Sequence, residues 1–212
     1  MKKEIYPKLF TWLFVGLLIT FIGGYSLSLN QELMYPLLTI GYIPIAITEI
    51  VVAIVLSARI YKMQPITAKI LYILYSLLTG VTFSVIFVEF ELQSVMSVFL
   101  VTSLLFGLLA FYGYITKRDL SKIGNILFVM LIGIILVSII NIFLRSSSLS
   151  LGISVLGVIV FMGYIIYDMN NIKYLENNID EDKAAVYGAF QLYLDFINLF
   201  IRLLEFFGKR KD

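Results

Sequence analysis

One segment near the end of the chain carries ionisable side chains along an otherwise apolar helix. Within residues 184–207, small or polar residues recur at intervals of three and four: Gly188, Gln191, Asp195, Asn198, Arg202 and Glu205. This spacing places them on one narrow face of an α-helix. A charge at the centre of a bilayer is costly even on permissive scales, so this stripe cannot face lipid. It must face protein or water.

Asp195 is the residue on this stripe that most needs a partner, because it lies roughly 16 Å beyond the start of the segment at 1.5 Å per residue. A second acid, Asp168, lies near the end of the preceding apolar segment. Two carboxyl groups in a low-dielectric site cannot easily both ionise, so they would share a proton. Such a pair is a proton-controlled latch, bonded when protonated and repelling when both groups are charged. The two acids meet only if the last helix begins about one turn outside the hydrocarbon.

Other polar residues are candidates for weaker roles. Glu49 lies near mid-depth of its segment and, with Asn198, is a candidate for an ion pathway. Asp168 and Asp195 offer the hard carboxylate oxygens that suit calcium. The alternatives stay open: Asp168 as an interfacial residue, Asn198 as a contact between helices, and Arg202 with Glu205 in structural roles.

The composition requires that these residues be held in a membrane. Hydrophobic residues make up 60% of the 212 residues and charged residues 14%, with a mean hydropathy of +0.97. A soluble domain carries about a quarter charged residues. Cysteine and histidine are absent, which excludes disulfides, thiolate metal sites and a histidine pH switch. The net charge of +2 comes from dispersed residues, so nucleic-acid binding is not expected.

The elements that position the acids are predicted to be transmembrane helices. A bilayer core takes about 20 apolar residues per helix, and this length predicts a single all-α domain over residues 1–212. The first segment is expected to be a retained helix, since no small-residue cleavage site follows it. The predicted spans are 9–28, 34–58, 68–88, 94–115, 122–144, 149–172 and 184–207.

Basic residues predict the orientation of these spans. On one side of the membrane fall Lys2, Lys3, Lys8, Arg59, Lys62, Lys69, Lys117, Arg118, Lys122, Lys173 and Lys183, against Arg145 on the other. The positive-inside rule then puts the N-terminus in the cytoplasm. Lys209, Arg210 and Lys211 would lie outside if the last helix crosses completely, which its length favours over a re-entrant helix.

Two stretches resemble a known family. Leu192-Tyr193-Leu194-Asp195-Phe196-Ile197-Asn198-Leu199-Phe200 is similar to the last-helix signature of the Bax inhibitor family, and Tyr167-Asp168 with Asn171-Ile172-Lys173 resembles the end of its sixth helix. The resemblance implies a prokaryotic calcium-leak protein in the cell membrane, with a central seventh helix wrapped by the other six. It also implies a pH sensor at Asp168 and Asp195, contacted by an arginine at the end of the second helix, for which Arg59 is the candidate.

The leading hypothesis is therefore a pH-sensitive calcium leak whose partners are the lipid bilayer, calcium ions and protons, with calcium as cargo and no cofactor. A proton-coupled cation transporter is the alternative, although no duplicated halves are evident. An intramembrane aspartyl protease is less favoured, because Tyr193-Leu194 stands where those enzymes carry glycine. We therefore expect no enzymatic activity.

Overall fold

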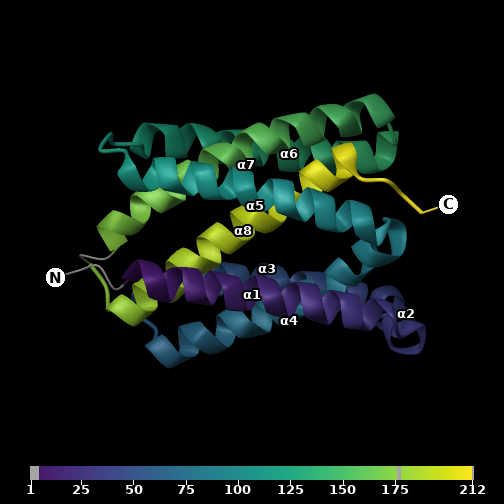
Figure 1. Ribbon diagram of the computed structural model, residues 1–212, viewed down its shortest axis with the longest axis horizontal. Helices are drawn as coiled ribbons and strands as arrows, with labels where there is room; N and C mark the ends of the chain where they lie inside the picture. Colours follow the sequence, from purple (N-terminus) through teal and green to yellow (C-terminus); the bar gives the residue numbers. More distant parts are fainter. Residues whose placement is uncertain (1–4, 176–177, 212) are drawn as a thin grey trace. The chain divides into compact units, whose positions relative to one another are not determined.

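The computed structural model describes residues 5–175 and 178–211, and within them the chain is helical almost throughout (Figure 1). Seven of the described helices are long and apolar enough to cross a membrane, which confirms the predicted all-α, seven-span class. The described helices are α1 (Ile5–Ser28), α2 (Gln31–Thr39), α3 (Tyr42–Arg59), α4 (Pro65–Glu89), α5 (Leu92–Ile115), α6 (Ser121–Leu144), α7 (Ser147–Leu175) and α8 (Glu181–Phe207).

The segment predicted as one span over 34–58 is two helices, which corrects the sequence-based prediction. α2 ends at Thr39 and α3 begins at Tyr42, so only α3 has the length of a span. The backbone turns at Gly41, whose N–H donates to the Pro36 carbonyl at 3.1 Å. A Cβ at Gly41 would lie 2.7 Å from the Leu37 carbonyl oxygen, so this tight turn requires glycine. Pro44 then falls in the first turn of α3, where a missing N–H breaks no helical hydrogen bond.

The chain divides into two compact units. The first contains Met1–Leu92, Leu175–Tyr193 and Arg210–Asp212, and the second contains Gln93–Tyr174 and Leu194–Lys209. α8 therefore contributes its first half to one unit and its second half to the other. In the most apolar part of α8, 72% of the residues are buried, against 11–39% in the other spans. Among the described spans, the last one is therefore the most buried.

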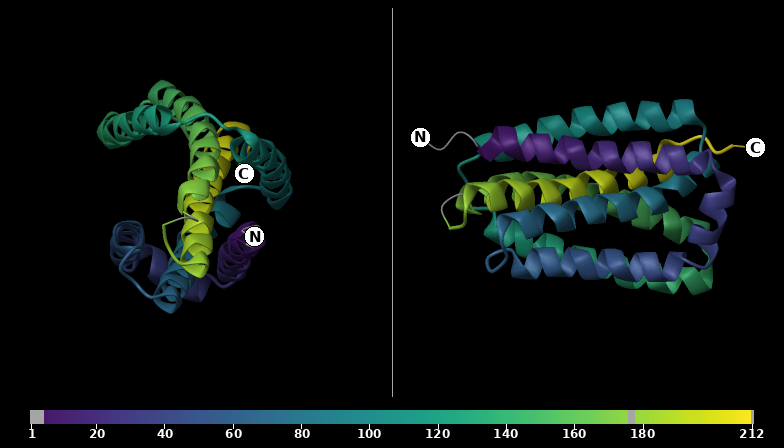
Figure 2. Two further views of the ribbon diagram at one scale, coloured as in Figure 1. Left: turned by 90° about the vertical axis from the view of Figure 1, so that its left-hand side faces the viewer. Right: turned by 90° about the horizontal axis from the view of Figure 1, so that it is seen from below.

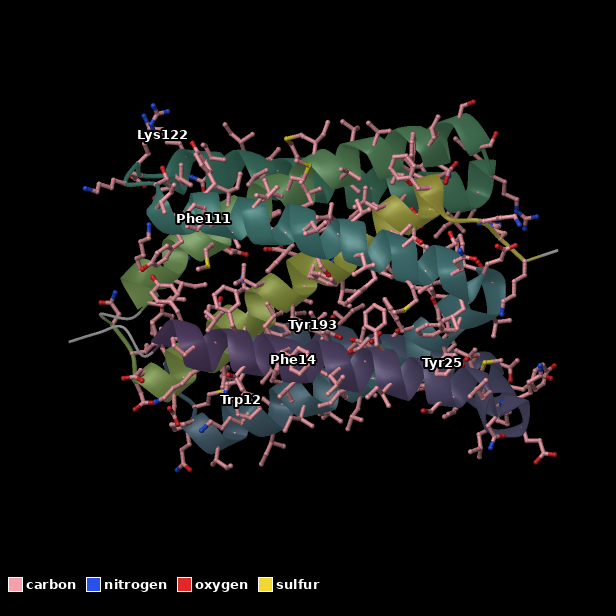
Figure 3. The ribbon with its side chains drawn as sticks, viewed as in Figure 1. Trp12, Phe14, Tyr25, Phe111, Lys122 and Tyr193 are labelled. Carbon is pink, nitrogen blue, oxygen red and sulfur yellow. The ribbon has the colours of Figure 1, made fainter. Side chains whose placement is uncertain are left out.

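In the first unit, α1 and α4 lie side by side (Figures 1 and 2) because small residues let their backbones approach. A Cβ added at Gly24 would lie 2.9 Å from the Gly80 carbonyl oxygen. Aromatic residues extend the contact, with the rings of Phe21 and Phe83 centred 5.2 Å apart. On the other faces apolar side chains such as Phe14 on α1 point outward, as lipid requires (Figure 3).

Within the same unit, the two ends of the last segment are tied to opposite ends of α4. At the start of α8, Asp182 pairs with Lys69 at 2.7 Å and with Lys8 at 3.0 Å, and both lysines lie near the starts of their helices. Beyond α8, the Lys211 N–H donates to the Glu89 carbonyl at 2.9 Å, where α4 ends. The chain therefore passes from one end of α4 to the other, which agrees with a full crossing by the last helix.

The adjacent glycines of α1 provide a test of the α1–α4 contact. We expect Gly24→Ala to destabilise the protein by about 1–3 kcal/mol, because the new methyl group has no room beside α4. Gly23→Ala is the matched control: a Cβ there meets nothing within 4 Å. That change should be neutral or stabilising by up to about 1 kcal/mol through helix propensity. Thermal unfolding in detergent measures both; equal effects at the two positions would contradict the packing.

Candidate functional site

Asp168 on α7 and Asp195 on α8 come together in the second unit. The two residues are 6% and 4% exposed, and their carboxyl groups interact with each other through a side-chain hydrogen bond. Among the described residues, the Oδ2 atom of Asp195 has no regular hydrogen-bond partner. A hydrogen bond between two carboxyl groups requires a proton on one of them. The arrangement is therefore the one expected of an acid pair that shares one proton.

Both acid-bearing helices extend beyond the predicted spans. α8 begins at Glu181, three residues before position 184, and α7 continues to Leu175, three residues past 172. The added length at the start of α8 is close to one turn. The two acids meet across helices that are each longer than their apolar segments.

Neighbouring helices hold the backbone around Asp168. A Cβ at Gly113 of α5 would lie 2.5 Å from the Ile166 carbonyl oxygen, and one at Gly124 of α6 would lie 2.4 Å from the ring of Tyr167. Both residues that precede Asp168 are therefore packed directly against glycine. These contacts fix the depth and rotation of the acid-bearing turn.

Two polar side chains beyond Asp168 join α7 to the end of α5. The Thr116 carbonyl accepts from Lys173 Nζ at 2.8 Å and from the Asn170 amide at 3.1 Å. The last carbonyls of a helix lack partners within that helix. Lys173 and Asn170 donate these hydrogen bonds here. They follow Asp168 in the sequence, so α7 is also held to α5 just after the acid.

Aromatic rings hold the turn of α8 that carries Asp195. Phe196 lies with its ring centre 5.5 Å from Phe99 and 5.5 Å from Phe106, both on α5 and both edge-on. Phe200 contacts Phe99 one turn later, at 6.3 Å. With these rings on α5, Asp195 faces α7.

Further along the stripe, Arg202 and Glu205 form an ion pair. Their Nη1 and Oε2 atoms are 2.9 Å apart, and the same oxygen accepts from Ser154 of α7 at 2.8 Å. The Arg202 side chain crosses the surface of Gly157, where a Cβ would lie 3.1 Å from its Cδ. The pair keeps both charges matched beside α7.

Three predicted site residues are not part of this acid pair: Asn198, Arg59 and Glu49. Asn198 donates to the Leu194 carbonyl of its own helix at 2.8 Å, so this hydrogen bond is not the contact between helices that was one alternative. Arg59 is the last residue of α3, and its side chain is exposed. Glu49 and Arg59 belong to the first unit, and their functional roles stay predictions.

Sequence reasoning missed the hydroxyl groups around Glu49. Thr82 donates to Glu49 at 3.5 Å, and the Thr79 side chain reaches Glu49, Tyr75 and Tyr193. A signal was present: Tyr72, Tyr75, Thr79 and Thr82 follow each other at intervals of three, four and three. This is the spacing that drew attention to α8, but hydroxyl groups barely lower the hydropathy of α4.

The described residues contain no group of three or more acidic side chains that could hold a metal ion. Calcium in proteins takes about 6–8 oxygen ligands.

The shared proton is open to a spectroscopic test. We expect infrared difference spectra of the protein in lipid to show a protonated carboxyl band that disappears as pH rises, because the pair then loses its proton. Asp168→Asn and Asp195→Asn should each shift the band and the pH at which it disappears, because the remaining acid no longer shares its proton, whereas Asp119→Asn, in an exposed loop between spans, should leave both unchanged. A band unaffected by either pair substitution would contradict proton sharing.

Comparison with known proteins shows the family to which this chain belongs. The family model described as inhibitor of apoptosis-promoting Bax1 matches residues 2–212. The chain is 42% identical to the inner membrane protein YbhL of Escherichia coli K12, over 96% of this chain and 91% of YbhL. It is 36% identical to an uncharacterized protein of Borreliella burgdorferi (100% and 94% covered), and 35% identical to the uncharacterized protein RP147 of Rickettsia prowazekii (97% and 89%). This chain is a multi-pass membrane protein that belongs to the Bax inhibitor family.

Proposed function

We propose that this protein is a pH-sensitive calcium leak channel, gated by the proton shared between Asp168 and Asp195. The observation that carries the proposal is the buried contact between these two carboxyl groups on neighbouring helices. Ionisable groups inside a membrane protein usually mark an ion or proton pathway. Their hydrogen bond also joins the helix carrying one acid to the helix carrying the other.

The direction of the pH response follows from the charges of the pair. At low pH the pair holds a proton, the hydrogen bond persists, and α7 and α8 stay joined. At higher pH both groups ionise, and two carboxylates repel each other in a medium of low dielectric constant. Opening therefore accompanies deprotonation, and acid closes the pathway.

Calcium is the proposed cargo, with protons as the regulating ligand. Carboxylate oxygens are hard ligands of the kind calcium prefers, and the opened pair would present two of them. Glu49 and Asn198 are further candidates for contact with a passing ion, and Arg59 is the candidate partner that family resemblance suggests for the acid pair. The mechanism uses no bound cofactor and includes no enzymatic step.

We place the protein in the cell membrane of a bacterium, with the N-terminus in the cytoplasm. The name of the E. coli relative describes it as an inner membrane protein, and the predicted cytoplasmic side collects most of the basic residues between spans. Lys211 lies at the end of α4 opposite the start of α8, so the C-terminal residues lie outside.

A topology reporter checks this orientation. Alkaline phosphatase fused to the C-terminus should be active, because that enzyme matures only outside the cytoplasm, and a fluorescent protein fused there should stay dark. Fusions within the loop between α3 and α4 provide the control and should give the reverse pattern. An inactive phosphatase at the C-terminus would overturn the assignment.

Calcium flux into proteoliposomes tests the function itself. Wild-type protein should pass calcium at neutral and higher pH, with flux falling by at least about tenfold on acidification. Asp195→Asn and Asp168→Asn should each abolish the pH dependence, because one amide and one carboxyl cannot exchange the shared proton. Asp119→Asn is the matched control and should retain the full pH response.

Two outcomes would contradict this function. If Asp195→Asn passed calcium with an intact pH profile, the pair would not be the gate. If an imposed proton gradient drove calcium uphill, a proton-coupled transporter would replace the leak. Cleavage of a membrane-helix substrate that required both aspartates would favour a protease.

A further inference from the structure

A second group of polar side chains lies in the first unit, around Glu49 of α3. Thr79 and Thr82 of α4 approach its carboxylate, and the Thr82 hydroxyl is 3.5 Å from Glu49 Oε1. The phenol of Tyr193, from the first half of α8, lies close enough for Glu49 to act on it electrostatically. Tyr193 is fully buried, and Figure 3 shows it beside α1. Three helices therefore bring oxygen atoms to one place.

The hydroxyl of Thr79 lies in the middle of this group without a regular partner. It reaches the side chains of Glu49, Tyr75 and Tyr193. Yet among the described residues its oxygen, in a side chain only 6% exposed, makes no hydrogen bond of regular geometry. A buried hydroxyl is normally satisfied. The Thr79 oxygen is therefore available to a ligand that the surrounding oxygens could also contact.

The two tyrosines of this group, Tyr193 and Tyr75, are held in place by other contacts. Tyr193 shares a hydrogen bond with Thr20 of α1, and Thr20 also donates to the Ser76 carbonyl at 3.0 Å. Tyr75 is fixed by the rings of Phe190 at 5.2 Å and Tyr193 at 5.9 Å. The phenols are thus held in position by contacts independent of Glu49, and the group is preorganised.

The charges define which ligand fits. Glu49 supplies one negative charge, the other groups are neutral hydroxyls, and within this unit the described residues give Glu49 no lysine or arginine ion pair. A half-buried carboxylate in apolar surroundings is stabilised by a counter-charge. One carboxylate balances one positive charge, whereas a divalent ion would leave a surplus charge in a medium of low dielectric constant. Oxygen-only ligands favour a hard ion over a soft one.

We propose that Glu49, Thr79, Thr82, Tyr75 and Tyr193 form a binding site for one hard monovalent cation of the sodium type. The site ties α3 to α4 and to the first half of α8. Its residues all belong to the first unit, so it does not depend on the acid pair. The bound cation supplies the positive charge that the surrounding side chains lack.

Sodium binding to the purified full-length protein in nanodiscs tests the site. We expect saturable binding of radioactive sodium, about one ion per chain, and a thermal midpoint that rises with sodium at constant ionic strength. Glu49→Gln should weaken binding by at least about tenfold, and Thr79→Val and Thr82→Val by a few fold each. Glu32→Gln, at an exposed residue of α2, is the matched control and should bind as wild type does.

The threonine variants keep the test decisive if Glu49→Gln fails to fold, because each retains the charge and nearly the same volume. Binding unchanged in Glu49→Gln, or in both threonine variants, would overturn the site. So would a wild-type protein without saturable sodium binding, whose oxygens then hold only water, or one in which calcium displaces sodium at equal concentration. Asp195→Asn should bind sodium normally, so failure of the gating model would leave this result unaffected.

Discussion

Lipid cannot hydrate an ionised side chain, and this constraint governs how the last two helices are built. In the second unit, the polar stripe of α8 meets partners on α7 or on its own helix. Asp195 bonds to Asp168, and Glu205 bonds to both Arg202 and Ser154. The helix backbone satisfies the amide of Asn198. α8 can therefore carry two acids and an arginine through apolar surroundings, because each charge is neutralised locally or shares a proton.

Much of this arrangement could be predicted, because periodicity reports which residues share a helix face. The stripe on α8, the importance of Asp195 and the number of spans all follow from spacing and hydropathy. The depth of the acids does not follow from them, because hydropathy indicates where the apolar part of a helix begins rather than where the helix itself begins. Glu181 and Asp182 were left outside the predicted span, yet acidic residues are favourable in the first turn of a helix. Their lysine partners on α1 and α4 could not be identified without the fold.

Other features escaped prediction for different physical reasons. The break between α2 and α3 at Gly41 depends on backbone geometry. It lies within an uninterrupted apolar stretch, so mean hydropathy along the sequence does not reveal it. The hydroxyl groups near Glu49 have the right spacing, but threonine and tyrosine are as common in packing as in binding. Only convergence from α3, α4 and α8 distinguishes them, and convergence is a tertiary property. Likewise, the sequence does not indicate that Lys173 and Asn170 donate hydrogen bonds to the carbonyl at the end of α5.

The two glycine contacts beside Asp168 constrain α7 within the second unit. Gly113 and Gly124 receive the Ile166 carbonyl and the Tyr167 ring at distances too short for a methyl group, so sliding or turning α7 would press its backbone against α5 and the Tyr167 ring against α6. The second half of α8 is held on α5 in another way, through the edges of aromatic rings. Edge-to-face rings prefer a particular geometry. The two acids are therefore presented to each other by helices whose register is fixed by two different kinds of packing, backbone against glycine on α7 and ring against ring on α8.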